Sequence, residues 1–238
     1  MKLSTLPLVI AHRGASGHAF ENSPAAFRRA VELAADAVEL DVHATRDGGL
    51  LVHHDPVVTG VGVIGERPLA ELRDHRLPNG EGIPTLAEAL DLLRGLDVWI
   101  EVKSLPARYD PALLDALRAG PTPARYAIHS FDHRIVARLG EIEPGLRRGV
   151  LLASYLLDPL APLHGTGADT LWMETHLIDR ELVLAVQDEG YQIIAWTAND
   201  DAEVRRLAAL GVDGICGNFP DRIRAGLAGG VAPDRSSP

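Results

Sequence analysis

Short apolar runs rich in valine and isoleucine alternate along the chain with segments whose apolar residues recur at helical spacing. Runs of the first kind begin near Leu8, Ala37, Val98, Arg125, Gly149, Thr170, Gln192 and Val212. Helical spacing occurs between them, over 25–35, 86–93, 112–119, 135–140, 180–189 and 202–210. Repeated strand–helix units of this kind predict a parallel sheet, and eight of them close a (β/α)8 TIM barrel.

Residues at the ends of the predicted helices agree with this scheme. Side chains that accept hydrogen bonds from free backbone N–H groups precede the helices, and glycines suited to helix termination follow them. The predicted N-caps are Ser23, Thr85, Asp179 and Asp200, and the predicted stops are Gly95, Gly140, Gly190 and Gly211.

We expect residues 1–225 to form a single (β/α)8 domain with a short insertion after the second strand, at 57–83. This insertion contains many glycines and two prolines but no clear strand–helix unit. It either shapes a pocket at the barrel mouth, where loops carry function, or merely connects two strands. Residues 226–238 are rich in glycine, proline and serine and are expected to form a disordered tail.

Composition and charge narrow the classes of partner. The chain has 238 residues, 46% of them hydrophobic, and a net charge of -10, which opposes binding to nucleic acid through a broad basic surface. The single cysteine, Cys216, excludes an internal disulfide and is expected to be buried. No apolar run approaches the roughly 20 residues that cross a bilayer, so we expect no stable membrane insertion and a cytoplasmic location.

Acidic residues stand where core strands should end. Glu39 and Asp41 share one face of the run that begins at Ala37, and Glu101 ends the next predicted strand. Three carboxylates at adjacent strand ends cannot all ionise without a cation, and oxygen ligands favour one Mg²⁺ or Ca²⁺ ion. The alternative is a metal-free network in which these acids pair with Arg13 and Lys103.

Two histidines also fall at strand ends, near the candidate metal ligands. His12 ends the first strand, and His54 follows a short extension of the second. Histidine exchanges protons near neutral pH, so the pair can divide general acid and general base roles in catalysis. His53 should point away from His54, whereas the strand ends at His129, Glu174 and His176 could also face the pocket.

A set of motifs runs through nearly the whole chain in a characteristic order. They are H-R-G at 12–14, E-N-S at 21–23, E-L-D-V at 39–42, T-R-D-G at 45–48, H-D-P at 54–56, I-P-T-L at 83–86, E-V-K at 101–103 and W-T-A-N at 196–199. In these motifs the chain resembles the glycerophosphodiester phosphodiesterase family.

The resemblance implies metal-dependent hydrolysis of small glycerophosphodiesters to sn-glycerol 3-phosphate and an alcohol. It implies Glu39, Asp41 and Glu101 as metal ligands and His12 and His54 as the acid–base pair. Arg13, Lys103 and Trp196 match positions that contact the substrate.

The chain departs from the family pattern at a few positions. Ser23 stands where threonine is usual, Gly217 and Asn218 stand where a Thr-Asp pair is usual, and the insertion lacks an Arg-Thr pair. Ser23 keeps the hydroxyl, so its helix cap should survive, whereas the other two departures bear on substrate preference.

Two other functions compete with this reading. The same site could act on lysophospholipids or another phosphodiester, which an apolar patch around 57–64 would favour. A non-catalytic phosphate-binding barrel would need neither the acids nor the histidines, and all five of these residues are present.

Overall fold

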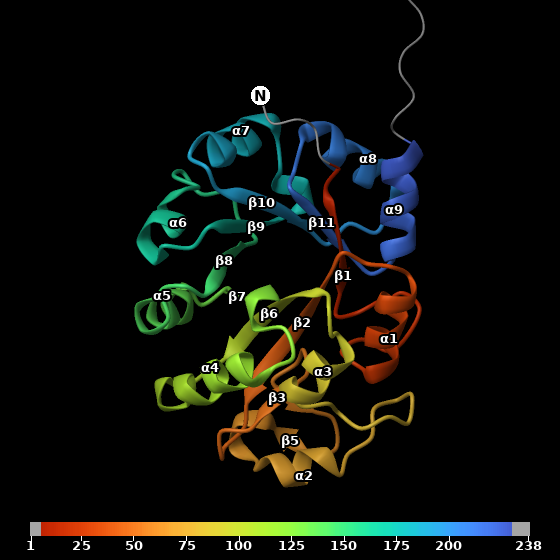
Figure 1. The fold of residues 1–238 in the computed structure, drawn as a ribbon, viewed down its shortest axis with the longest axis vertical. Helices are drawn as coiled ribbons and strands as arrows, with labels where there is room; N and C mark the ends of the chain where they lie inside the picture. Colours follow the sequence, from red (N-terminus) through yellow and green to blue (C-terminus); the bar gives the residue numbers. More distant parts are fainter. Residues whose placement is uncertain (1–5, 230–238) are drawn as a thin grey trace, which may run out of the picture.

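The computed structural model describes residues 6–229, and within this range eight parallel strands close into a barrel (Figure 1). The barrel strands are β1 (Leu8–His12), β2 (Ala37–Ala44), β6 (Asp97–Ser104), β7 (Tyr126–Ser130), β8 (Arg147–Leu152), β9 (Thr170–Glu174), β10 (Gln192–Trp196) and β11 (Gly214–Gly217). Each pairs with the next in chain order, and pairing of β1 with both β2 and β11 closes the ring. The predicted (β/α)8 fold is confirmed, and every strand begins within two residues of its predicted position.

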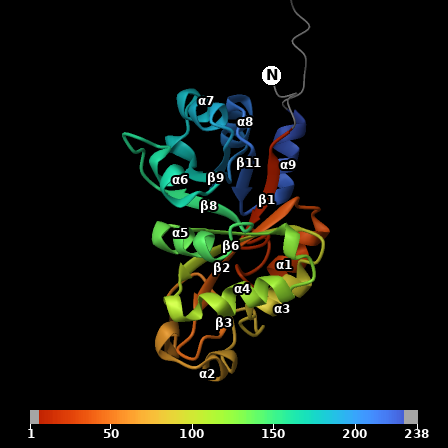
Figure 2. The ribbon, with the colours of Figure 1, turned by 60° about the vertical axis from the view of Figure 1, so that its left-hand side comes forward.

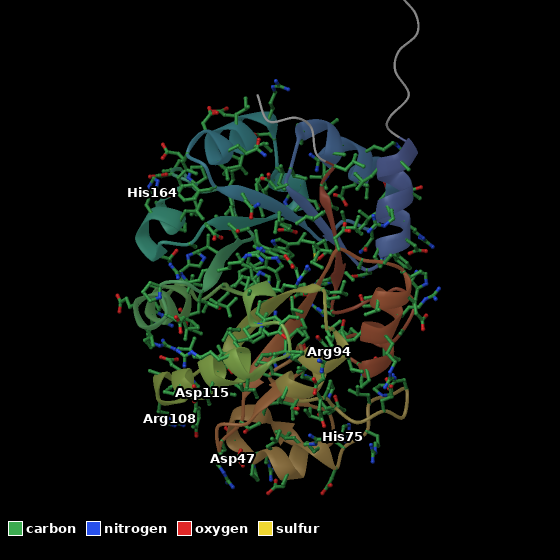
Figure 3. The ribbon with its side chains drawn as sticks, in the orientation of Figure 1. Asp47, His75, Arg94, Arg108, Asp115 and His164 are labelled. Atoms are coloured by element: carbon green, nitrogen blue, oxygen red, sulfur yellow. The ribbon has the colours of Figure 1, made fainter. Side chains whose placement is uncertain are left out.

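Helices follow the barrel strands and surround them on the outside (Figures 1 and 2). They are α1 (Pro24–Glu32), α3 (Leu86–Leu92), α4 (Asp110–Ala119), α5 (His133–Ile142), α6 (Ala161–Thr166), α7 (Arg180–Asp188), α8 (Asp201–Leu210) and α9 (Pro220–Gly229). Single 3-10 turns lie at η2 (Ala107–Tyr109), η3 (Pro123–Arg125) and η4 (Thr175–Leu177). Charged side chains such as Asp47, Arg108 and Asp115 are exposed on the periphery (Figure 3).

Side-chain alternation along the strands separates two apolar layers. The inner layer receives one residue from each barrel strand: Ile10, Ala37, Trp99, Ala127, Leu151, Trp172, Ile194 and Cys216. The outer layer lies between strands and helices and includes Val38, Leu40 and Val42 of β2. Because Glu39 and Asp41 alternate with these outer residues, they face the barrel interior above the inner apolar layer.

The insertion has a small core of its own. Strand β3 (Leu50–Val52) pairs antiparallel with the end of β2, and β4 (Val57–Val58), β5 (Gly62–Val63), η1 (Ile64–Glu66) and α2 (Leu69–Arg73) follow it. Its buried apolar residues are Leu51, Val58, Ile64, Leu72, Leu77 and Ile83. The insertion therefore forms a packed unit beside the barrel, at the bottom of Figure 1.

The predicted N-caps are all confirmed, but one predicted helix stop is wrong. Ser23, Thr85, Asp179 and Asp200 each accept a backbone N–H with the side chain. Gly140 lies inside α5, where a Cβ atom would come within 2.6 Å of the Arg148 guanidinium. This glycine makes room for a neighbouring side chain and does not end the helix.

The C-terminal expectation needs a correction as well. Helix α9 continues to Gly229, so the first four residues of the expected disordered tail are helical. Buried Ile223 and Leu227 hold this helix against the barrel, and packing of this kind outweighs the low helix propensity of glycine. Residues 230–238 of the expected tail lie outside the described residues.

Among the described helices, none combines the length and apolar character needed to span a bilayer.

Candidate active site

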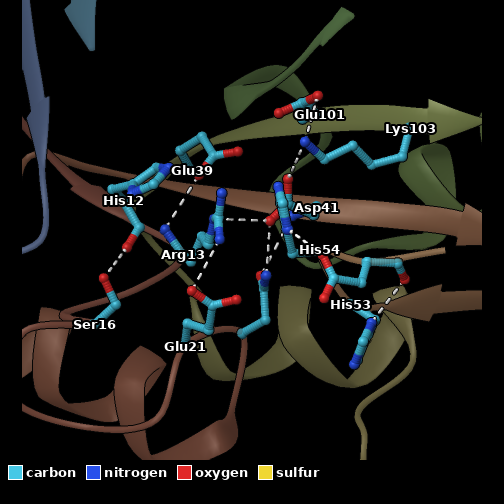
Figure 4. A network of polar contacts seen from close by, with 12 residues as sticks. His12, Arg13, Ser16, Glu21, Glu39, Asp41, His53, His54, Glu101 and Lys103 are labelled. Atoms are coloured by element: carbon cyan, nitrogen blue, oxygen red, sulfur yellow. Dashed lines mark hydrogen bonds and ion pairs between the residues drawn. The ribbon is translucent and has the colours of Figure 1, made fainter. Parts of the chain in front are cut away.

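Neighbouring strands bring the predicted site residues other than Trp196 into one network (Figure 4). His12 ends β1 and Arg13 follows it, Glu39 and Asp41 lie on β2, and Glu101 and Lys103 lie on β6. His54 follows β3, which continues the sheet beyond β2. Residues that are distant in the sequence therefore meet at the barrel mouth, where this architecture places its active sites.

A tight turn in the H-R-G motif aims Arg13 at the acidic strand. Arg13 and Gly14 both adopt positive φ angles, 54° and 78°. A Cβ atom on Gly14 would lie 2.7 Å from the backbone of Ala26, so only glycine fits there. The turn allows the Arg13 backbone N–H to donate to Glu39 at 3.1 Å and places Arg13 Nε 3.2 Å from Asp41.

Glu39, Asp41 and Glu101 form a compact, buried cluster of carboxylates. One oxygen from each lies within 4.8 Å of the others. Burial, followed by the charge of Asp41, raises the pKa of Glu39 to about 7 and that of Glu101 to about 8. Burial alone would raise the pKa of Asp41 too, but Lys103 and Arg13 outweigh it and lower that pKa.

The two basic side chains offset only part of this negative charge. Lys103 Nζ lies 3.2 Å from Asp41 and 2.7 Å from Glu101, and Arg13 also pairs with Glu21 at 2.9 Å. Glu39 and Glu101 keep raised pKa values despite these neighbours, so a metal-free network leaves two carboxylates poorly stabilised as anions. Three converging carboxylates suit a hard divalent cation such as Mg²⁺ or Ca²⁺, and the residues present fit that ion.

Both histidines stand at the edge of the cluster and reach solvent. His12 Nε2 lies 3.9 Å from Glu39, and its Nδ1 lies 2.8 Å from the side-chain oxygen of Asn218. His54 Nδ1 hydrogen-bonds to the Asp55 carboxylate at 2.8 Å. In each ring one nitrogen is held by a neighbour, which leaves Nε2 available for proton exchange with a substrate.

Several polar residues at the site were absent from the predicted set, among them two asparagines and a histidine. Asn22 donates to Asp41 at 2.7 Å and accepts the Asp41 backbone N–H at 3.3 Å. Asn218 contacts His12, and His43 contacts the His54 carbonyl at 2.9 Å. Asn22 belongs to the E-N-S motif and His43 lies on the inward face of β2, so the sequence offers a signal for both. For Asn218 the sequence offers only a departure from the family pattern.

The remaining strand-end residues have different surroundings. Trp196 is half-buried at the end of β10, with its ring 5.5 Å from that of Phe131. His129 is buried against Trp172, and burial lowers its pKa to about 3, so it is neutral. Glu174 lies 3.5 Å from His176. His53 Nδ1 donates to the Asp55 carbonyl and points away from the cluster.

A cavity of about 340 Å³ opens beside His54, between the β1–α1 loop and the insertion. Phe20, Glu21, His75 and Arg76 contribute to its lining. The apolar patch considered around 57–64 is small, because Val58 and Ile64 are buried in the core of the insertion and only a few valines, including Val57, are exposed. The cavity is therefore of mixed polarity.

Comparisons with known proteins agree with this geometry. A model of the glycerophosphoryl diester phosphodiesterase family matches residues 12–222. A glycerophosphodiester phosphodiesterase of Caldanaerobacter subterraneus subsp. tengcongensis is 34% identical over 232 residues, which cover 91% of this chain and 96% of that protein.

Two solved structures extend the similarity to the fold. One is an Oleispira antarctica phosphodiesterase in complex with the product sn-glycerol-3-phosphate, with a TM-score of 0.87, 26% identity, and coverage of 94% of this chain and 97% of that chain. The other is an Agrobacterium tumefaciens glycerophosphodiester phosphodiesterase, with a TM-score of 0.81, 28% identity, and coverage of 92% and 100%. The chain is thus an enzyme that belongs to the glycerophosphoryl diester phosphodiesterase family.

Proposed function

We propose that this enzyme hydrolyses glycerophosphodiesters to sn-glycerol 3-phosphate and an alcohol with the help of one divalent cation. The observation that carries the proposal is the cluster of Glu39, Asp41 and Glu101, whose oxygens converge within 4.8 Å beside two histidines. The similarity to a phosphodiesterase solved with sn-glycerol-3-phosphate supports this choice of product.

The three carboxylates would hold the cation. When bound, a divalent ion polarises a phosphate oxygen and stabilises the charge that develops during phosphodiester cleavage. Arg13 and Lys103 face the same space and bind the phosphate through charge-assisted hydrogen bonds. Trp196 at the end of β10 supplies an aromatic wall for the substrate.

His12 and His54 divide the two proton transfers of the reaction. One accepts the proton of the nucleophile, and the other donates a proton to the oxygen of the departing alcohol. The nucleophile is water or the glycerol 2-hydroxyl of the substrate, and the second course forms a cyclic phosphate first. The cavity beside His54 has room for part of the substrate beyond the phosphate.

Product analysis tests the proposal directly. Purified enzyme is incubated with glycerophosphocholine, after chelation and after separate addition of Mg²⁺ or Ca²⁺, and the released choline and sn-glycerol 3-phosphate are quantified. We expect turnover that chelation abolishes and one of the ions restores. Equal turnover before and after chelation would exclude the metal, and faster turnover of lysophosphatidylcholine in a parallel assay would shift the substrate to lipids.

A further inference from the structure

His43 joins both strands of the acidic cluster to the segment that carries His54. It lies near the C-terminal end of β2 and is buried, with 4% of its surface exposed. Its Nε2 lies 2.9 Å from the carbonyl oxygen of His54, and its Nδ1 lies 3.0 Å from Ser104 Oγ on β6. Both ring nitrogens are therefore engaged by atoms from other segments.

These partners determine where the proton of His43 resides. A carbonyl oxygen only accepts hydrogen bonds. Nε2 of His43 therefore carries the proton and donates a hydrogen bond to the His54 carbonyl. A neutral ring protonated at Nε2 accepts at Nδ1, so the Ser104 hydroxyl is the donor there. Ser104 consequently donates a hydrogen bond to His43, and His43 donates one to the backbone of His54.

Ser104 reaches His43 because the pairing of β2 with β6 is irregular at this point. Val42 lies opposite Val102, but His43 lies opposite Ser104, so Lys103 is an extra residue in a β-bulge. A regular register would place Lys103 opposite His43. The bulge instead brings the serine hydroxyl to the histidine, while Lys103 contacts the carboxylates.

The His54 carbonyl lies just beyond the last backbone pairing of this segment with β2, and His43 supplies the hydrogen bond to it. Strand β3 stops at Val52, and the His53 N–H still donates to the Asp41 carbonyl at 3.1 Å. The side-chain bond of His54 is made to Asp55, whose side chain is 70% exposed. An exposed pair of this kind restrains a side chain weakly, whereas the bond from His43 is shielded.

We propose that His43 is a positioning residue that holds the His54 imidazole at the carboxylate cluster through its hydrogen bond to the His54 carbonyl, with Ser104 fixing its tautomer. This inference rests on the proposed function, in which His54 transfers a proton. His43 itself does not contact the substrate and acts only through His54.

Two substitutions at one position separate positioning from general packing. His43→Leu removes both hydrogen bonds, whereas His43→Gln retains an amide N–H near the position of Nε2. We expect His43→Leu to lower kcat by about 10- to 100-fold, as loss of an outer contact to an essential group does. We expect KM to change less than about threefold and His43→Gln to recover most of kcat. Ser104→Ala should give a smaller loss in the same direction.

A double-mutant cycle identifies the residue through which His43 acts. In a His54→Ala background, His43→Leu should cause no further loss of kcat, because the group that it positions is gone. Calorimetric titration with Ca²⁺ or Mg²⁺ should give unchanged affinity. Additive losses, or affinity for the ion that falls as far as kcat, would overturn the inference, as would full activity of His43→Leu.

A structural readout does not depend on turnover. The crystal structure of His43→Leu should show residues 53–55 displaced while Glu39 and Asp41 stay in place, and unmoved His54 would refute positioning. If wild-type enzyme fails to hydrolyse glycerophosphocholine, the proposed function fails and this readout still decides the role of His43. If His43→Leu does not fold, His43→Gln and Ser104→Ala support the same kinetic comparison.

Discussion

Substitution of Glu39 by glutamine should make the metal-free protein more stable at alkaline pH while removing a ligand of the proposed ion. Glu39 is buried, and burial followed by the charge of Asp41 raises its pKa from 4.5 to about 7. Glutamine has nearly the same shape as the protonated acid but never becomes an anion. The variant therefore removes the cost of ionising this position.

The sign and size of the effect follow from the pKa shift. Below pH 4.5 the carboxyl is protonated in folded and unfolded chains alike, so glutamate and glutamine behave similarly. As the pH rises from 4.5 towards 7, the unfolded chain loses the proton first and the folded state loses stability. The full shift corresponds to about 3 kcal/mol, at about 1.4 kcal/mol per pKa unit.

Urea unfolding of wild type and Glu39→Gln, with a chelator at pH 4.5 and pH 8.5, measures this difference. We expect similar free energies of unfolding at the lower pH and a variant that is more stable by about 3 kcal/mol at the higher pH. With Mg²⁺ or Ca²⁺ at 100 times its Kd, wild type should gain about 2.7 kcal/mol and the variant much less. A variant no more stable than wild type in chelator at pH 8.5 would refute the reasoning.

Three further substitutions test other parts of the site. His54→Ala should lower kcat by about 10²- to 10⁴-fold with unchanged affinity for the ion, measured by steady-state kinetics and calorimetry; wild-type turnover would exclude proton transfer by His54. Lys103→Met should lower kcat/KM for glycerophosphocholine by about 10²-fold or more, because it removes a cation from the phosphate site. Gly14→Ala should lower the free energy of unfolding by more than about 1 kcal/mol, since it combines a φ of 78° with contact to the Ala26 backbone. Gly60→Ala is the matched control, with a φ of 83° and no neighbouring atom within 4 Å, so denaturation curves should show a smaller loss there.

Local sequence patterns predict this fold well because inward-facing and outward-facing side chains alternate along each barrel strand. Alternation along β2 places Val38 and Leu40 against the helices and Glu39 and Asp41 in the barrel, as the structure has them. Helix α9 departs from its pattern, since its glycines indicate a tail while buried Leu227 holds it against the barrel. Packing against strands that are distant in the sequence decides whether such a segment is helical, and the local sequence pattern does not reveal that packing.

The site residues likewise separate into those that local sequence predicts and those that depend on distant contacts. Residues on the inward face of a barrel strand, such as His12 and Asp41, are predictable from position along the chain. The residues that orient them are not, because Asn218 meets His12 across 206 residues of sequence and its side chain could have faced several ways. Contacts of this kind depend on how the barrel closes, which pairs β1 with β11.

The bulge in β6 shows why the spacing of a motif can matter as much as its residues. E-V-K at 101–103 would fit a regular strand, in which Lys103 lies opposite His43. The observed register puts Ser104 there instead and leaves Lys103 beside Asp41 and Glu101. One extra residue thus serves both the charge of the carboxylate cluster and the segment that holds His54. Lys103→Met removes only the first of these contacts, whereas Ser104→Ala disturbs only the second.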